Sequence, residues 1–191
     1  MSTVSDIFYF SSSSLNLSFD LRRASFFQKN NQNFILQQSV KQLPIMQNLS
    51  LLDVYLSRGH SVETHWHPNA NELVYMIQGE AVISTLNPFT LQILSYHVKP
   101  PQTVYIPMGW WHWAIAEMDH THLLAIFDNK DPGVIYGSDI LRKTPPEVFQ
   151  EIYGVNAAQL AEVLKPIDQT VVIGPPNSEE IRWRIGSKGN F

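Results

Sequence analysis

Seven short runs of β-forming residues lie between positions 51 and 127 of this 191-residue chain, and turn-forming residues separate them. Apolar runs of this length, regularly spaced and bounded by Gly, Pro and Asn, are typical of strands in an all-β sandwich or barrel. We therefore expect an all-β fold. The runs are 51–56, 62–67, 73–77, 81–86, 103–107, 112–116 and 122–127.

Composition divides the rest of the chain. A serine run and an Asn/Gln-rich patch near the N-terminus are typical of a loose arm outside a core. Two glycines, one proline and three aspartates between 128 and 139 predict a loop long enough to move as a lid. The expected parts are an N-terminal arm (1–39), a β-barrel core (40–127), a lid loop with two helices and a closing strand (128–174), and a polar tail (175–191).

Two short helices are predicted after the lid. Thr144 precedes two prolines and a glutamate, so we expect it to cap the first helix, with Gly154 at the end. Asn156 with Gln159 three residues later predicts the cap of the second helix, which Pro166 should end.

Charge and cysteine content exclude several classes of function. Thirteen Lys and Arg against 17 Asp and Glu, with no dense basic block, argue against nucleic acid as a partner. The absence of cysteine excludes thiolate catalysis and Cys-ligated metals. No signal peptide or long apolar run is present, so we expect a soluble, cytoplasmic protein that does not bind membranes. Charged residues make up only 16%, which predicts a homo-oligomer, a dimer or larger.

All seven histidines lie within about a third of the chain. His65 and His67 are two residues apart in a strand-like run, so both side chains leave the same face. A Pro-Asn turn follows, and Glu72 is expected to open the second strand of a hairpin. His112 follows another tight turn. Three imidazoles and one carboxylate suit Mn, Fe, Ni, Co or Zn and leave about two positions open on an octahedral ion.

An isolated His-x-His pair more often packs or lies at the surface than binds a metal. The complete spacing is more specific, and it resembles the two signature motifs of the cupin superfamily. That resemblance implies that His65, His67, Glu72 and His112 bind one metal ion inside a small, jelly-roll-like β-barrel. Pro101 and Ala116 depart from the second motif at positions that are not ligands. The matching residues are Gly59, His65, His67, Glu72, Gly79, Pro107, Gly109 and His112.

The likeness extends over about residues 40–165 to one half of the two-domain oxalate decarboxylases. In that family manganese binds oxalate and dioxygen, an arginine holds the substrate carboxylate, and a glutamate on a mobile lid donates a proton. Val62 stands at the arginine position in this chain. The only carboxylate in the lid segment 129–138 is Asp131, which is therefore the candidate catalytic acid.

The resemblance implies a single-domain metalloenzyme of the decarboxylase or oxygenase type. Its substrate would be a small carboxylate or hydroxylated molecule, with O2 as a possible co-substrate, and its metal would be Mn first and Fe second. The missing arginine and lid glutamate favour an alternative to this enzyme, namely a cupin that binds or stores a metal or small ligand without turnover. The stretch 119–122 could form a second metal site, but a solvated turn and strand start is its more ordinary interpretation.

Overall fold

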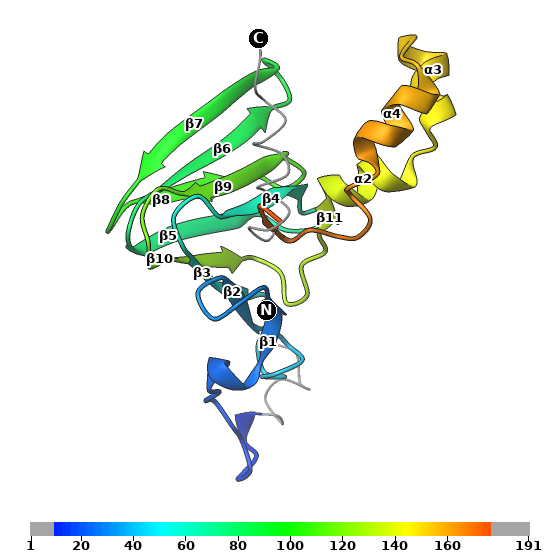
Figure 1. The fold of residues 1–191 in the computed structure, drawn as a ribbon. Coiled ribbons are helices and arrows are strands. Elements are labelled where there is room, and N and C mark those ends of the chain that lie inside the picture. Colours follow the sequence, from blue (N-terminus) through cyan, green and yellow to red (C-terminus); the bar gives the residue numbers. More distant parts are fainter. Residues whose placement is uncertain (1–9, 177–191) are drawn as a thin grey trace.

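A computed structural model describes residues 10–176, and two antiparallel sheets stacked as a sandwich make up most of it (Figure 1). The expected all-β, jelly-roll class is confirmed. The sheets do not close into a barrel, because no strand in the described range pairs with members of both sheets. No helix within residues 10–176 is long and apolar enough to cross a membrane. The N-terminal residues 1–9 and most of the predicted polar tail, 177–191, lie outside the described residues.

The first sheet has six strands in the order β1-β2-β3-β10-β5-β8. Its middle strands are long because their sequences are rich in Leu, Ile, Val and Tyr, which favour extended backbone. The strands are β1 (Ser25–Gln28), β2 (Phe34–Gln38), β3 (Ser50–Leu56), β5 (Glu72–Gln78), β8 (Thr103–Ile106) and β10 (Thr121–Phe127).

The second sheet follows the order β11-β4-β9-β6-β7, and a short strand, β12, also pairs with β4. β12 lies at the end of the part 128–174, where the closing strand is predicted. The strands are β4 (Ser61–Trp66), β6 (Ala81–Asn87), β7 (Gln92–Val98), β9 (His112–Ala116), β11 (Ile135–Tyr136) and β12 (Ile173–Gly174).

Part of the predicted N-terminal arm belongs to the sheet. A 3-10 helix, η1 (Leu21–Arg23), precedes β1 and β2, and β2 pairs with β3 over its full length. Ile35 of β2 is 2% exposed and packs in the core. The Asn/Gln-rich stretch that suggested a loose lead-in is the turn between these strands, where Asn30 and Asn33 are hydrogen-bonded to each other.

Three helices project from the edge of the second sheet that carries β11 (Figure 1). The two predicted helices are present, and the Asn156 cap is confirmed because its side chain accepts from the backbone N–H of Gln159. The predicted Thr144 cap is wrong by one residue: Pro145 precedes the helix without a side-chain cap, and Thr144 instead ends an additional helix. The helices are α2 (Gly137–Lys143), α3 (Pro146–Tyr153) and α4 (Ala157–Leu164).

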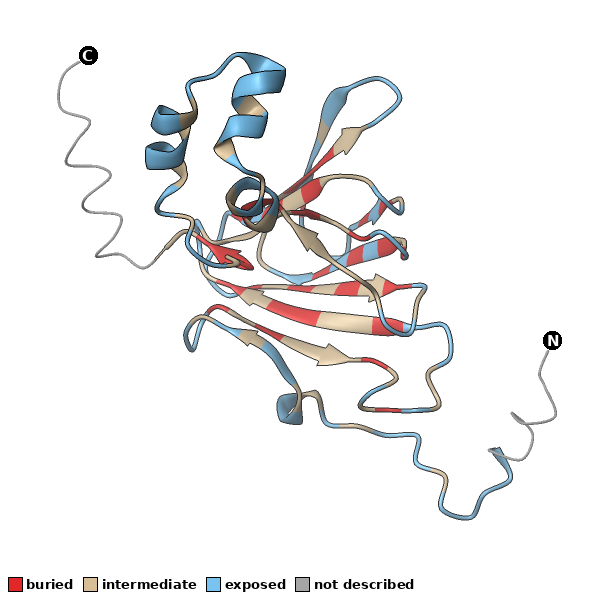
Figure 2. Cartoon of the chain, turned by 90° about the vertical axis from the view of Figure 1, so that its right-hand side faces the viewer, coloured by how far each residue is buried: buried red, intermediate tan, exposed pale blue. Residues whose placement is uncertain are grey.

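The core lies between the sheets. Buried and less buried positions alternate along the strands, as Figure 2 shows by colour. In β10 the residues Leu123, Ala125 and Phe127 point inward. Inward residues of both sheets thus form one apolar layer, and polar side chains that enter it have to be partnered or coordinated.

Candidate metal centre

The four predicted ligands come from strand starts and ends that face one another across the sandwich. His65 lies in β4 and His67 directly after it, whereas Glu72 opens β5 and His112 opens β9. His65 and His112 are direct partners in the β4–β9 register. The predicted β4–β5 hairpin is wrong, because β4 and β5 belong to different sheets. The turn between them carries the chain across the sandwich, so Glu72 meets the imidazoles from the opposite wall.

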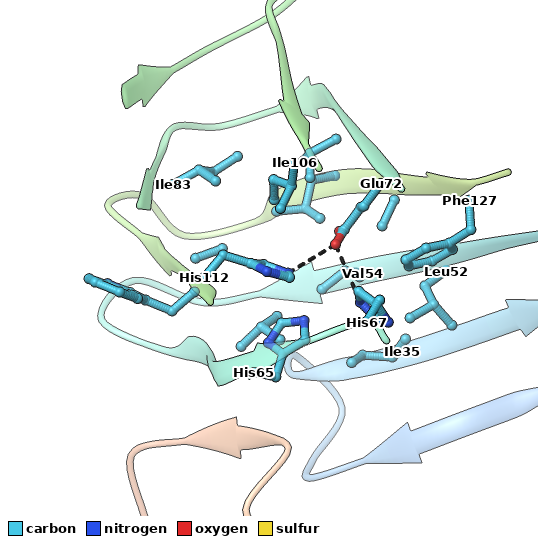
Figure 3. Close-up of a pocket in the computed structure, with 16 residues that line it drawn as sticks. Ile35, Leu52, Val54, His65, His67, Glu72, Ile83, Ile106, His112 and Phe127 are labelled. Atoms are coloured by element: carbon cyan, nitrogen blue, oxygen red, sulfur yellow. Dashed lines mark ion pairs between the residues drawn. The ribbon is translucent and has the colours of Figure 1, made fainter. Parts of the chain in front are cut away.

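The four side chains converge on one point inside the molecule, as Figure 3 shows. One potential ligand atom from each of them lies within 4.8 Å of the others, and all four residues are buried. Glu72 Oε2 lies 3.0 Å from His112 Nε2 and 3.4 Å from His67 Nε2. In spite of these distances, none of these three atoms has a hydrogen bond of acceptable geometry. Unpartnered polar atoms at this depth are rare in proteins and indicate a missing ligand or ion.

Backbone carbonyls fix the tautomer of each imidazole. The Nδ1 atoms of His65, His67 and His112 lie 2.6, 2.7 and 2.8 Å from the carbonyl oxygens of Glu63, Gly133 and Trp110. A carbonyl oxygen can only accept, so each Nδ1 must donate, and each neutral ring then has a lone pair on Nε2. The Nε2 atoms of His67 and His112 lie beside the Glu72 carboxylate, an arrangement that a shared cation would stabilise.

Burial and mutual charge set the protonation of the cluster. Burial, with help from the neighbouring His112, lowers the pKa of His65 to about 3. Burial alone would raise the pKa of Glu72, but the imidazoles of His112 and His67 outweigh it and hold that pKa well below its usual range. Burial likewise opposes charge on His112, yet the Glu72 carboxylate raises the pKa of this imidazole. When no cation is bound, His112 therefore takes up a proton more readily than an isolated imidazole does.

A cavity of about 40 Å³ adjoins the cluster, which is space for a few water molecules at most. Its remaining wall is almost wholly apolar and includes Val62, the residue at the position of the family arginine, as well as Phe127. No lysine or arginine of the described chain lines it. The cavity can therefore admit a small ligand beside a metal but offers no cationic side chain to a free carboxylate.

The predicted lid segment is held in place. Asn69 accepts from the Gly133 N–H (2.7 Å), and its own amide nitrogen lies 3.3 Å from the Asp131 carbonyl. The Asn129 amide donates to the Asn69 carbonyl (2.7 Å), and β11 then pairs with β4. The expectation of an irregular loop over 128–139 is wrong in its second half, where β11 and α2 form.

Asp131 is the one predicted site residue that lies apart from the others. Its side chain is 51% exposed, and its carboxylate lies 3.0 Å from the Lys41 ammonium. It is not among the residues that line the cavity. In this conformation Asp131 does not face the four predicted ligands.

Two asparagines of the first-motif turn position the site and were not predicted to do so. Asn69 holds the loop whose Gly133 carbonyl accepts from His67. Asn71 donates to the Asp128 carboxylate and accepts from the Met108 N–H, which ties the two motif turns together. The only signal in the sequence was that Asn is frequent in turns, and this does not reveal its distant partners.

The remaining histidines have other partners. His60 contacts the Ser57 hydroxyl, exposed His97 pairs with Glu117, and His122 contacts Asp53. The stretch 119–122 contains a turn residue, His120, and the start of β10. The four-residue cluster is the single group of potential metal ligands found within residues 10–176.

This chain belongs to the cupin family: the match to the family described as Cupin covers residues 23–161. Legumin B of Pisum sativum is 28% identical over 124 residues, which are 63% of this chain and 37% of that protein. Oxalate decarboxylase OxdC of Bacillus subtilis strain 168 is 28% identical over 128 residues, 65% of this chain and 33% of the decarboxylase. The chain thus spans about a third of the length of these curated relatives.

Solved structures show the same fold. Oxalate decarboxylase from Bacillus subtilis at pH 4.6 superposes with a TM-score of 0.76 at 23% identity, covering 88% of this chain and 44% of that chain. A second structure of that enzyme, described through its Mn(II) centres, gives a TM-score of 0.75 at 23% identity over 90% of this chain and 45% of that one.

Proposed function

We propose that this cupin is a metalloenzyme that binds one divalent ion, manganese first and iron second, through His65, His67, Glu72 and His112. The main support is that buried polar atoms of His67, Glu72 and His112 have no hydrogen bond and converge at the edge of an apolar cavity. Nitrogen and carboxylate ligands also suit Ni, Co and Zn, so the ligand set alone does not select the metal. The Mn(II) centres of the related decarboxylase favour manganese.

The cavity favours a small substrate of low charge. When bound, the metal would polarise a coordinated oxygen atom or activate O2. Apolar walls exclude water and strengthen electrostatic interactions inside the cavity. Because no cationic side chain of the described residues lines it, oxalate is disfavoured as a substrate. A hydroxylated molecule or a monocarboxylate, in a decarboxylase or oxygenase reaction, fits this wall better.

Other parts of the proposed reaction would depend on side chains of this protein. Glu72 stays ionised because of its lowered pKa and supplies the one negative charge of the site. The three Nδ1 donors keep the imidazoles in the ligating tautomer. Asp131 is the proposed acid, and it would have to leave Lys41 and turn towards the cavity before it could donate a proton.

The second candidate is a cupin that binds or stores a metal or small ligand without turnover. Its support is the similarity to legumins, together with a cavity wall that contains no acid beyond the ligand Glu72 among the described residues.

Turnover by metal-loaded protein distinguishes the two candidates. The chain would be loaded with Mn(II) or Fe(II) and assayed on small carboxylates, hydroxy acids and catechols, with O2 uptake and CO2 release as readouts. Activity that requires metal and disappears in Glu72→Gln supports the enzyme. Full metal occupancy without turnover on the whole panel, in air and under nitrogen, would overturn it in favour of the binding protein.

A further inference from the structure

Two successive rows of strand residues form the apolar cavity beside the predicted ligands. The first row contains Glu72 and His112 themselves, which open β5 and β9. A residue two positions along a strand points to the same face, about 7 Å further into the sandwich. In β9 that residue is Ala114. In β10 it is Ala125, two positions from Phe127, the register partner of Glu72. Both alanines are buried and line the cavity, so each sheet contributes one to its deeper row.

Branched apolar side chains lie beside both alanines. Each alanine has a register partner on either side, and all four partners also line the cavity: Leu52 and Val74 beside Ala125, and Val62 and Ile83 beside Ala114. An alanine side chain ends at Cβ, so space remains at these two positions that a larger residue would fill. The cavity thus extends from the ligand atoms into the apolar layer between the sheets.

The size and lining of this space limit what it can hold. The cavity volume of about 40 Å³ corresponds to about three water-sized groups, because one such group needs roughly 10–15 Å³. Apart from the four predicted ligands, no lining residue of the described chain carries a charge. The cavity therefore has one polar end, at the ligands, and one apolar end, at the alanines.

The charge of the metal-loaded site favours one carboxylate over two. The three imidazoles are neutral, since each Nδ1 carries the proton, and Glu72 contributes one negative charge. A divalent ion among them leaves one positive charge, which a single carboxylate neutralises. The second carboxylate of a dianion would lie among apolar side chains without a partner, and burial of an unpaired charge is costly.

We propose that the site takes a short aliphatic monocarboxylate, with its carboxylate at the metal and an apolar end of two or three carbon atoms against Ala114 and Ala125. This inference rests on the proposed function and narrows its substrate class. The two alanines are then the residues that determine how long a substrate the site accepts.

Ligand binding to Mn(II)-loaded protein tests this substrate class without requiring turnover. Metal content is measured first, and changes in the Mn(II) EPR signal then report the binding of acetate, propionate, hexanoate and oxalate. Burial of one methylene group raises affinity about fourfold, so propionate should bind about fourfold more tightly than acetate. Hexanoate is too long for the cavity and oxalate carries a second charge, so both should bind at least about tenfold more weakly than propionate.

A variant that fills the deeper row tests the role of the alanines. Ala125→Val is expected to lower propionate affinity at least about tenfold, while formate affinity and Mn(II) content stay at the wild-type level. The matched control is Ala116→Val, the same change at a buried alanine of β9 that does not line the cavity. It should bind propionate as the wild type does, and circular dichroism checks that both variants fold.

The outcomes separate this proposal from the proposed function. Bound metal with equal affinities along the wild-type series, or equal loss of propionate binding in both variants, would overturn the substrate class alone. If a variant does not fold, the wild-type series decides. Metal uptake and the expected series without turnover would overturn only the proposed catalysis, whereas a chain that takes up no Mn(II) would overturn both.

Discussion

The ligand cluster and the neighbouring segment 128–136 differ in how much chemistry they supply. The cluster of His65, His67, Glu72 and His112 brings buried ligand atoms together from both sheets. The neighbouring segment 128–136 contributes a backbone carbonyl, at Gly133, whereas its acid, Asp131, pairs with Lys41 at the surface. The proposed metal site thus lies on strands and directly after one, while the proposed proton transfer would depend on a loop. Binding and turnover should be separable in this protein, and the following changes test that separation.

The largest effect is expected from removing the negative charge of the cluster. Glu72→Gln keeps the shape of the side chain but leaves only three neutral imidazoles as ligands. Loss of a residue that merely orients a ligand lowers metal affinity by up to about 100-fold, so loss of this charged ligand should lower the affinity for Mn(II) by more than about 100-fold. Isothermal titration calorimetry would measure it. Glu117→Gln, which removes an exposed carboxylate paired with His97, is the control and should bind normally.

Acidification should weaken metal binding through His112. Its pKa is raised in the folded protein by the Glu72 carboxylate, so below that pKa the ring carries a proton that the metal must displace. Affinity should therefore fall about tenfold for each pH unit below it, and level off above it. His65, with its pKa lowered to about 3, adds nothing near neutrality. Metal titrations at a series of pH values measure how the affinity depends on pH. An affinity that does not change with pH would contradict the protonation of His112 described here.

A change in the loop should reach the cluster through one hydrogen bond. Asn69→Ala removes the side chain that holds the segment carrying Gly133, so the His67 ring loses its fixed acceptor. Mn(II) affinity should drop on the order of 10-fold, as is usual for outer-shell partners. Asn156→Ala, which removes an exposed side-chain-to-backbone hydrogen bond at the start of α4, is the control. Equal affinities for both variants would mean that the loop does not orient His67.

The smallest effect on the metal is expected for Asp131→Ala. Because this side chain faces solvent and Lys41, metal content should stay at the wild-type level. Turnover on any substrate found by the panel should fall, since Asp131 is the proposed acid. Undiminished turnover would remove Asp131 from the mechanism and leave the metal site unaffected.

The first-motif residues of the cluster could be predicted because their spacing is local, whereas His112, much further along the chain, was added by the resemblance to the second cupin motif. His65 and His67 share a face by strand alternation, and the motif turns place Glu72 and His112 near them. The same spacing could not reveal whether the chain turns back within one sheet or crosses to the other, since both paths need turn residues. The hairpin prediction failed for that reason.

The structure of the segment 128–139 was harder to predict from the sequence, because it depends on hydrogen-bond partners that are distant in the chain. Gly, Pro and Asp between 128 and 139 suggested mobility, but Asn69 and Asn71 anchor the first half. The helix α2 was missed because Tyr136 precedes it without a side-chain cap, and it starts with Gly137 and Ser138. In strands such as β10 the sequence is apolar almost throughout, so only the register separates the inner residues of the first sheet from its outer ones.

The central claim is that these four side chains form a metal site, and elemental analysis of untagged protein tests it most directly. Purified wild type should contain close to one equivalent of a divalent metal per chain, with manganese or iron giving its own EPR signature, and His67→Ala should retain little of it while keeping the β-rich fold by circular dichroism. A folded His67→Ala variant with unchanged metal content would contradict the account.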